Sequence, residues 1–269
     1  MLVEMPDTSA GADDSRATLP PSATPIVAFF DVDNTLMRGA SVYHLGRAAW
    51  KRGYVTFRDL IRFGWKQMRF IAVGENARHQ VAVRDRALEL IAGHTEAELE
   101  ELAVETYEKR IEKLLLPETV GLAQDHRDKG HEVWLITATP EACARVIAER
   151  LGLTGAIGSR IVSVDGVFTG ELLGHVMHGV HKATAAAELA AERGAALDDC
   201  WAYSDSRNDI PLLELVGNRV VVNPDAALAR YAKQHSWPVL TAGASSIRAA
   251  RRRVRREARA VARDARRAS

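Results

Sequence analysis

The amino-acid sequence predicts an α/β fold: a mostly parallel sheet, interrupted by an inserted helical unit. From Val120 onward, short apolar strands alternate with helical segments, as is typical of parallel strands joined by crossover helices. Between residues 38 and 116, apolar residues instead recur at helical spacing with few strand signals, which indicates an insertion. With 269 residues, of which 47% are apolar, the chain can bury a large core.

The first expected strand runs from Ile26 to Phe30. It consists of five apolar residues of types favoured on a pleated surface, and Asp31, Asp33 and Asn34 follow at once. Because side chains alternate along a strand, Asp31 and Asp33 start on the same side, and two close carboxylates repel unless a cation or a proton separates them. The strand therefore predicts a chemical site at its end, with an ordinary Asp-Asn turn as the alternative.

The inserted unit is expected to contain two amphipathic helices. In the first, apolar residues recur every three or four positions from Phe57 to Ile71, with basic residues on another face. Thr95 and Glu98 have the spacing of a capping box, which predicts that the second helix begins there. The apolar residues of the second helix are Leu99, Leu102, Tyr107, Ile111 and Leu115.

The remaining elements follow from apolar runs and turn residues. They are a helix over 118–129, a strand over 131–136, a helix from Pro140 to about Leu151 with Thr139 as N-cap, a hairpin over 160–173 about Asp165-Gly166, a helix over 183–193, a strand over 200–203, a helix opened by Pro211, and a last clear strand over 219–223.

Polar clusters follow three of these strands: Asp31 with Asp33, Thr137, and Asp205 with Asp209. In a parallel sheet, ligands bind beyond the carboxyl ends of the strands, so these clusters are expected to meet in one crevice.

Phosphoryl transfer is the chemistry that this donor set fits best. Carboxylates of Asp31 and Asp205 are hard oxygen ligands for Mg²⁺, and Thr137 precedes a helix N-terminus that suits phosphate oxygens. Lys182 supplies positive charge against the transferred group. We expect Asp31 to be the nucleophile and Asp33 the general acid/base, which predicts a magnesium-dependent phosphomonoester hydrolase acting through an aspartyl phosphate on a small phosphorylated metabolite.

Four ordered segments resemble the motifs of the haloacid dehalogenase superfamily, and in particular its phosphoserine-phosphatase-like IB subfamily. They are Asp31-Val32-Asp33-Asn34-Thr35, Thr137, Lys182, and Ser204 through Asp209. The resemblance implies a doubly wound, Rossmann-like core of residues 25–37 and 117–245 and a helical cap of residues 38–116. Two segments lie outside it: residues 1–24, whose composition predicts a disordered leader, and residues 246–269, a basic tail.

The same resemblance implies roles for individual residues. Asp31 matches the phosphorylated nucleophile, and Asp33 matches the acid/base, whose backbone carbonyl also contacts magnesium. Asp205 matches the other metal carboxylate, and Asp209 the acid that supports the metal site. The phosphate contacts are matched by Thr137, Lys182 and Asn208.

One segment departs from phosphoserine phosphatases, which resemble one another in placing an acid shortly after the first motif to pair with the substrate's amino group. The matching position here is about Ala40, and residues 34–58 contain no acid. They contain the basic residues Arg38, His44, Arg47, Lys51, Arg52 and Arg58. Phosphoserine is therefore disfavoured, and a leaving group with its own negative charge, such as a carboxylate or a second phosphate, is expected.

The C-terminal tail concentrates positive charge. Ten arginines against Glu257 and Asp264 give residues 246–269 a formal charge of +8, so the rest of the chain carries −7. The tail from Arg248 to Arg267 is either a solvated extension or a contact for an anionic membrane surface or nucleic acid. Two alternatives to the leading function follow: a phosphatase of lipid-linked phosphate docked by the tail, and a regulatory protein that binds an anionic partner with little turnover.

The remaining sequence features concern the cellular location of the protein, its cysteines and a possible zinc site. No apolar run of roughly 20 residues and no secretory signal is present, so we expect a cytoplasmic address, with a peripheral membrane position as the alternative. Cys143 and Cys200 are expected to be buried, reduced thiols. His175, His178 and His181 recur every third residue, but their spacing fits no common zinc motif, so they are expected to be loop residues.

Overall fold

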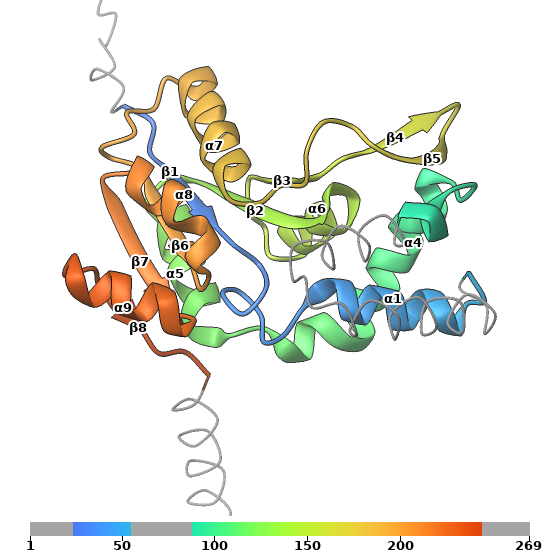
Figure 1. The fold of residues 1–269 in the computed structure, drawn as a ribbon, viewed down its shortest axis with the longest axis horizontal. Helices are drawn as coiled ribbons and strands as arrows, with labels where there is room; N and C mark the ends of the chain where they lie inside the picture. Colours follow the sequence, from blue (N-terminus) through green and yellow to red (C-terminus); the bar gives the residue numbers. More distant parts are fainter. Residues whose placement is uncertain (1–23, 55–87, 244–269) are drawn as a thin grey trace, which may run out of the picture.

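The computed structural model describes residues 24–54 and 88–243 (Figure 1). The expected leader, the helix expected over 57–71 and the basic tail lie outside the described residues. Within the described ranges, no helix combines the length and the apolarity that crossing a bilayer requires.

A six-stranded sheet with the strand order β3-β2-β1-β6-β7-β8 forms the centre of the molecule, and all its pairs are parallel (Figure 1). Its strands are β1 (Val27–Phe30), β2 (Glu132–Pro140), β3 (Gly155–Ser159), β6 (Trp201–Ser204), β7 (Asn218–Val222) and β8 (Val239–Leu240). The chain adds strands to one side of β1 and then to the other, so the strand order reverses between β1 and β6. Ligands bind at such a reversal, beyond the carboxyl ends of the strands.

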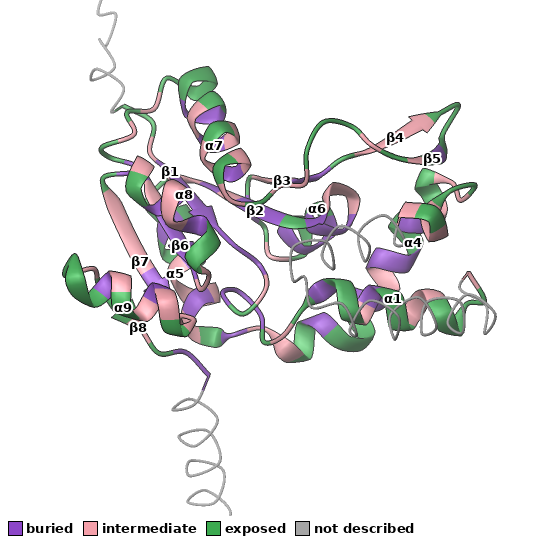
Figure 2. Cartoon of the chain, viewed as in Figure 1, coloured by how far each residue is buried: buried purple, intermediate pink, exposed green. Residues whose placement is uncertain are grey.

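Helices cover both faces of this sheet (Figure 1). They are α5 (Pro117–Asp128), α6 (Glu141–Arg150), α7 (Val180–Arg193), α8 (Ile210–Leu215) and α9 (Ala226–Gln234). Alternate side chains of β1 enter two cores: Ala28 and Phe30 join the core that includes residues of α5 and α6, and Val27 and Phe29 join the core that includes residues of α7 and α8. All four are fully buried, and Figure 2 shows the central strands as buried. This burial on both faces fixes β1 as the rigid support of the carboxylates that follow it.

The inserted unit lies beside the sheet and contains α1 (Ser41–Lys51) and α4 (Glu96–Thr106), followed by a π-helical turn (Tyr107–Ile111) and a 3₁₀ turn (Glu112–Leu114). The predicted capping box is confirmed: Thr95 Oγ1 accepts from the backbone N–H of Glu98, and Glu98 Oε2 accepts from that of Thr95. The hairpin of β4 (Ile161–Val164) and β5 (Val167–Leu172) contacts this unit, because Glu96 donates its N–H to the carbonyl of Gly166 at 2.9 Å.

Most predicted elements are confirmed, with shifts of a few residues. Asp165 and Gly166 both have positive φ, of 51° and 76°, as a two-residue hairpin turn requires. Cys143 and Cys200 are buried free thiols, as expected.

Two predictions were wrong. Thr139 does not cap α6: β2 continues to Pro140, which is the N-cap and makes no side-chain cap bond, while the Thr139 hydroxyl bonds other side chains. A further strand, β8, follows the last clear strand and was not predicted, because its two residues are too few to show a period. The helix begun at Thr95 leaves α-helical geometry at Tyr107.

Candidate active site

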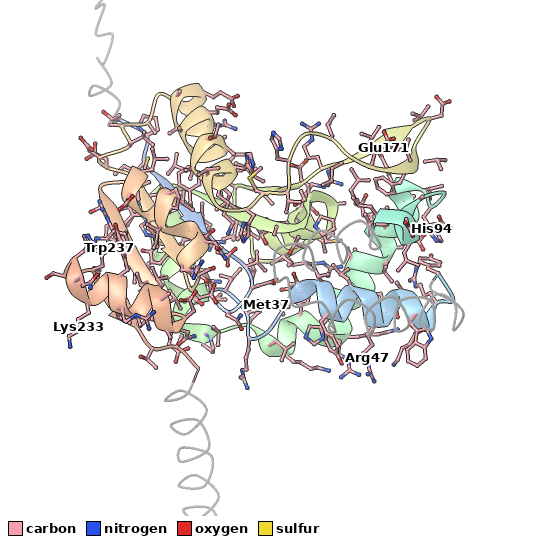
Figure 3. All side chains as sticks on the ribbon, viewed as in Figure 1. Met37, Arg47, His94, Glu171, Lys233 and Trp237 are labelled. Carbon is pink, nitrogen blue, oxygen red and sulfur yellow. The ribbon has the colours of Figure 1, made fainter. Side chains whose placement is uncertain are left out.

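A tight loop after β1 presents Asp31 and Asp33. The N–H groups of Leu36 and Met37 both donate to the Val32 carbonyl at 3.0 Å, which folds the chain back within five residues. Asn34 closes the loop with a left-handed φ of 56°, a conformation that asparagine tolerates, and its Oδ1 accepts from the Gly39 N–H at 3.0 Å. Met37 is fully buried and lies between the sheet and α1 (Figure 3).

Lys182 reaches this loop from the first turn of α7. Its Nζ lies 2.6 Å from Asp31 Oδ1 and 2.7 Å from Asp209 Oδ2. All three residues are buried, with 3%, 6% and 2% of Lys182, Asp31 and Asp209 exposed, so water screens these contacts little. Three residues from separate segments of the chain, as sequence analysis predicts, therefore meet at one point.

Asp209 holds the lysine in place. Its Oδ2 accepts from Lys182 Nζ and also from the Ser204 hydroxyl, at 2.7 Å each. The Ser204 oxygen in turn accepts the Ser206 N–H at 3.2 Å. Asp209 therefore anchors Lys182 through Oδ2, which accepts from both Lys182 and Ser204.

Two carboxylates at this site, those of Asp31 and Asp205, have a raised pKa. Burial raises the pKa of Asp31 to about 6, with Lys182 opposing the rise and the Asp209 charge reinforcing it. Burial and the charge of Asp31 raise the pKa of Asp205 to about 7. Burial alone would lower the pKa of Lys182, but Asp31 and Asp209 outweigh it and the pKa is raised. Among the described residues, burial and the mutual repulsion of the aspartates therefore outweigh the effect of Lys182 on Asp31 and Asp205.

Asp205 follows β6, the neighbour of β1, and its loop is tied to α9. The Asp205 carbonyl accepts from the Asp225 N–H at 2.9 Å. The Asp225 carboxylate accepts from the N–H of Arg207 and from those of Ala227 and Leu228, at 2.8 Å each, and so caps α9. This double anchor fixes the loop that carries Asp205.

Asp33 faces the inserted unit. Its Oδ1 accepts from the Ser41 N–H at 2.8 Å, the first residue of α1. The Ser41 hydroxyl lies 2.6 Å from Thr139 Oγ1, and Thr137 Oγ1 donates to Thr139 Oγ1 at 3.1 Å. A chain of buried hydroxyls therefore connects Thr137 on β2 with the helix that contacts Asp33.

The Asn208 side chain bonds Ser206 and not Asp31, Lys182 or Asp209. Asn208 is exposed, and its side-chain amide donates to Ser206 Oγ at 3.2 Å. The backbone before α7 passes close to it, because a Cβ added at Gly179 would lie 3.5 Å from the Asn208 carbonyl. Asn208 therefore sits beside the start of the helix that carries Lys182.

His175 and His178 lie in the loop before α7, as expected, whereas His181 is the second residue of α7 and not a loop residue. The rings of His175 and His181 stack with centroids 4.1 Å apart and planes 13° apart. Across residues 24–54 and 88–243, no three His, Cys, Asp or Glu side chains group as a metal cage. The histidines thus give no support to a zinc site.

Neither Ser41 nor Ser204 is among the site residues predicted from the sequence. Ser204 directly precedes Asp205, so its position in that motif could have identified it. No sequence feature identifies Ser41, because its partner Thr139 lies 98 positions away.

Comparison with known proteins agrees with this geometry. Residues 28–214 match the model of the haloacid dehalogenase-like hydrolase family. A Mycobacterium tuberculosis protein named phosphoserine phosphatase is 46% identical over 238 residues, covering 88% of this chain and 77% of that protein. A histidinol-phosphatase of Neisseria meningitidis is 32% identical over 219 residues, covering 80% of this chain and 97% of that protein.

A solved structure supports the same relationship. A Bordetella pertussis protein of unknown function matches with a TM-score of 0.71 at 28% identity, and the match covers 81% of this chain and 99% of that one. The family model spans well over half of the sequence. This chain therefore belongs to the haloacid dehalogenase-like hydrolase family and is a phosphatase of that family.

Proposed function

We propose that this phosphatase is magnesium-dependent and hydrolyses a small phosphomonoester through a phosphoryl group carried on Asp31. The observation that supports this most directly is the buried contact between Lys182 Nζ and Asp31 Oδ1, which lie 2.6 Å apart. The second acid, Asp33, follows Asp31 by two residues. A carboxylate attacks phosphorus only when positive charge offsets its repulsion of the phosphate dianion, and Lys182 supplies part of that charge.

The reaction has two steps on these side chains. An oxygen of Asp31 forms a bond to phosphorus as the ester P–O bond breaks, and Asp33 gives a proton to the departing alkoxide. Asp33 then takes a proton from water as the water oxygen bonds to phosphorus, and the bond between phosphorus and Asp31 breaks. Thr137, Lys182 and Asn208 are the proposed phosphate contacts.

The donor set fits a magnesium ion. Asp31 and Asp205 offer two carboxylates, and magnesium in proteins commonly uses one or two together with water and substrate phosphate. Both carboxylates have a pKa that is raised first by burial and then by neighbouring aspartates, and a bound cation would offset both effects. The Asp33 carbonyl is the proposed third protein ligand, and Asp209 supports the site by holding Lys182. When bound, the ion would supply positive charge against the phosphate oxygens.

Magnesium should therefore raise the melting temperature more at high pH than at low pH. Protons compete with the ion for Asp205, whose pKa of about 7 exceeds its ordinary value of 3.8. Without metal, the raised pKa of Asp205 means that the folded protein loses stability as pH rises from about 4 to 7, because the carboxyl group ionises less readily in the folded than in the unfolded state. With metal, the ionised carboxylate favours binding of the ion, and binding stabilises the folded protein. Thermal unfolding with and without Mg²⁺ at pH 5.5 and pH 8 measures this. An equal shift at both values, or a full shift in Asp205→Asn, would contradict the assignment.

The leaving group is proposed to carry its own negative charge. The first turn of α1 has no acidic residue, and residues 34–54 contain none. His44 lies in α1 and interacts electrostatically with Asp33. Burial lowers the pKa of His44, and the charge of Arg110 lowers it further. Arg52 is committed elsewhere, since its Nε lies 2.6 Å from Glu105, and Arg47 projects from α1 away from the sheet (Figure 3). A lowered pKa leaves His44 mostly neutral near pH 7, so among the described residues it is the charge of Arg110, which acts on His44, that supports this proposal.

A panel of phosphate esters tests the function and the substrate class together. With Mg²⁺ present, an ester of a hydroxy acid, such as phosphoglycolate, should exceed phosphoserine and histidinol phosphate in kcat/KM by on the order of tenfold, the lower end of what a focused charge provides. Phosphoserine or histidinol phosphate as clearly the best substrate would overturn the anionic leaving group, and hydrolysis of no ester would overturn the function.

A further inference from the structure

Helix α1 begins without a cap from its own neighbourhood. Its N-cap residue, Ala40, makes no side-chain cap bond, and its first turn has no acidic residue. The first N–H, that of Ser41, instead donates to Asp33 Oδ1 at 2.8 Å. The Asp33 carboxylate therefore takes the place of a cap at the positive end of the first helix of the inserted unit.

The residue that makes this contact is itself fixed to the sheet. Ser41 Oγ and Thr139 Oγ1 lie 2.6 Å apart, and these residues are 0% and 1% exposed. Buried hydroxyls cannot exchange this partner for water, so the pair keeps the start of α1 in register with the end of β2. Thr139 also bonds Thr137, the proposed phosphate contact.

We propose that Ser41 is a positioning residue for Asp33. Its N–H holds Oδ1 of the carboxyl group, and its hydroxyl, through Thr139, keeps that N–H in place. This inference rests on the proposed function, in which Asp33 protonates the leaving group. It adds that the acid and the phosphate-contacting strand share one hydrogen-bond chain, and that this chain crosses from the core to the inserted unit.

A loosened Asp33 should affect leaving groups unequally. Phenolate is a strong base and needs a proton as it departs, whereas p-nitrophenolate departs readily without one. The two phosphate esters are otherwise close in shape. The ratio of kcat/KM for p-nitrophenyl phosphate to that for phenyl phosphate therefore reports on proton delivery by Asp33, and a loss of folded enzyme would lower both rates equally.

Three variants dissect the contact. Ser41→Pro removes the N–H donor, and the helix should tolerate it, because proline is favoured at the first helical position and Ala40 already has the extended φ of −101° and ψ of 122° that a following proline requires. Ser41→Ala and Thr139→Val keep that N–H and remove one hydroxyl each. Tyr43→Phe, which removes a hydroxyl from a 65% exposed side chain of the same turn, is the matched control.

We expect Ser41→Pro to raise the ratio by about tenfold or more, a part of the 10²- to 10⁴-fold that general acid catalysis contributes. Ser41→Ala and Thr139→Val should raise it less, and Tyr43→Phe should not change it. If Ser41→Pro does not fold, the ratios measured for Ser41→Ala and Thr139→Val test the inference. A ratio equal to wild type in every folded variant would overturn this inference alone, whereas hydrolysis by the wild type of neither these two esters nor any ester of the panel would overturn the proposed function with it.

Discussion

Asp31→Asn is expected to lower kcat/KM by roughly 10⁴- to 10⁶-fold, the range seen when a nucleophile or its base is removed from a hydrolase. The amide of asparagine is a poor nucleophile toward phosphorus. It has the same shape as the carboxylate, and its oxygen can still accept from Lys182 Nζ, which lies 2.6 Å from Asp31 Oδ1. The fold should therefore persist. Steady-state hydrolysis of p-nitrophenyl phosphate with Mg²⁺, together with thermal unfolding, measures both expectations.

The matched control is Asp128→Asn, which makes the same change at an exposed position near the end of α5. It should leave kcat/KM at the wild-type value. Turnover by purified Asp31→Asn within about tenfold of wild type would show that another group attacks phosphorus, because a tenfold change corresponds to only about 1.4 kcal/mol of the barrier.

Lys182→Met should lower the free energy of unfolding by about 3–5 kcal/mol at pH 8, the usual cost of leaving a buried charge without its partner. The substitution keeps the length of the side chain but removes the ammonium between Asp31 and Asp209. The cost should shrink as pH falls, because the pKa of Asp31 is already raised to about 6 and would rise further without the lysine. Urea unfolding at pH 8 and pH 5.5, without metal, measures this difference.

The double variant Lys182→Met with Asp209→Asn provides the control. This double variant also removes the charge of Asp209, one of the two carboxylates that Lys182 contacts in the wild type. Relative to Lys182→Met alone, it should regain part of the free energy of unfolding at pH 8, but it should not regain turnover. A single Lys182→Met variant as stable as wild type at pH 8 would contradict the view that the lysine neutralises the cluster.

The central part of the fold could be predicted because its signals are local. A fully apolar strand that ends in two aspartates, followed by alternating strands and helices, indicates a parallel sheet and the edge at which its polar residues gather. The placement of Asp31, Lys182 and Asp209 within 2.7 Å contacts follows from that topology and from the order of the motifs. The strand order itself is a tertiary outcome, and no periodicity encodes it.

What sequence analysis missed depends on contacts between distant segments. Thr139 precedes Pro140, a pair typical of a helix N-terminus. In the structure, however, the Thr139 hydroxyl bonds Ser41, 98 positions away, and β2 extends to Pro140. Tertiary hydrogen bonding there outweighs a local preference of about 1 kcal/mol for a capping side chain. Ser41 was missed for the same reason, because its contacts with Asp33 and Thr139 depend on how the inserted unit docks on the sheet.

The most direct test of the account is to trap the phosphoryl group. Enzyme mixed with a ³²P-labelled ester and Mg²⁺ is quenched in acid during turnover, and a second sample is reduced with borohydride, which converts an aspartyl phosphate to homoserine. The account predicts acid-stable, base-labile label on the protein and homoserine at position 31 in peptide mass spectra, with neither in Asp31→Asn. Label at any other residue, or turnover with no labelled protein under conditions that slow water attack, would contradict it.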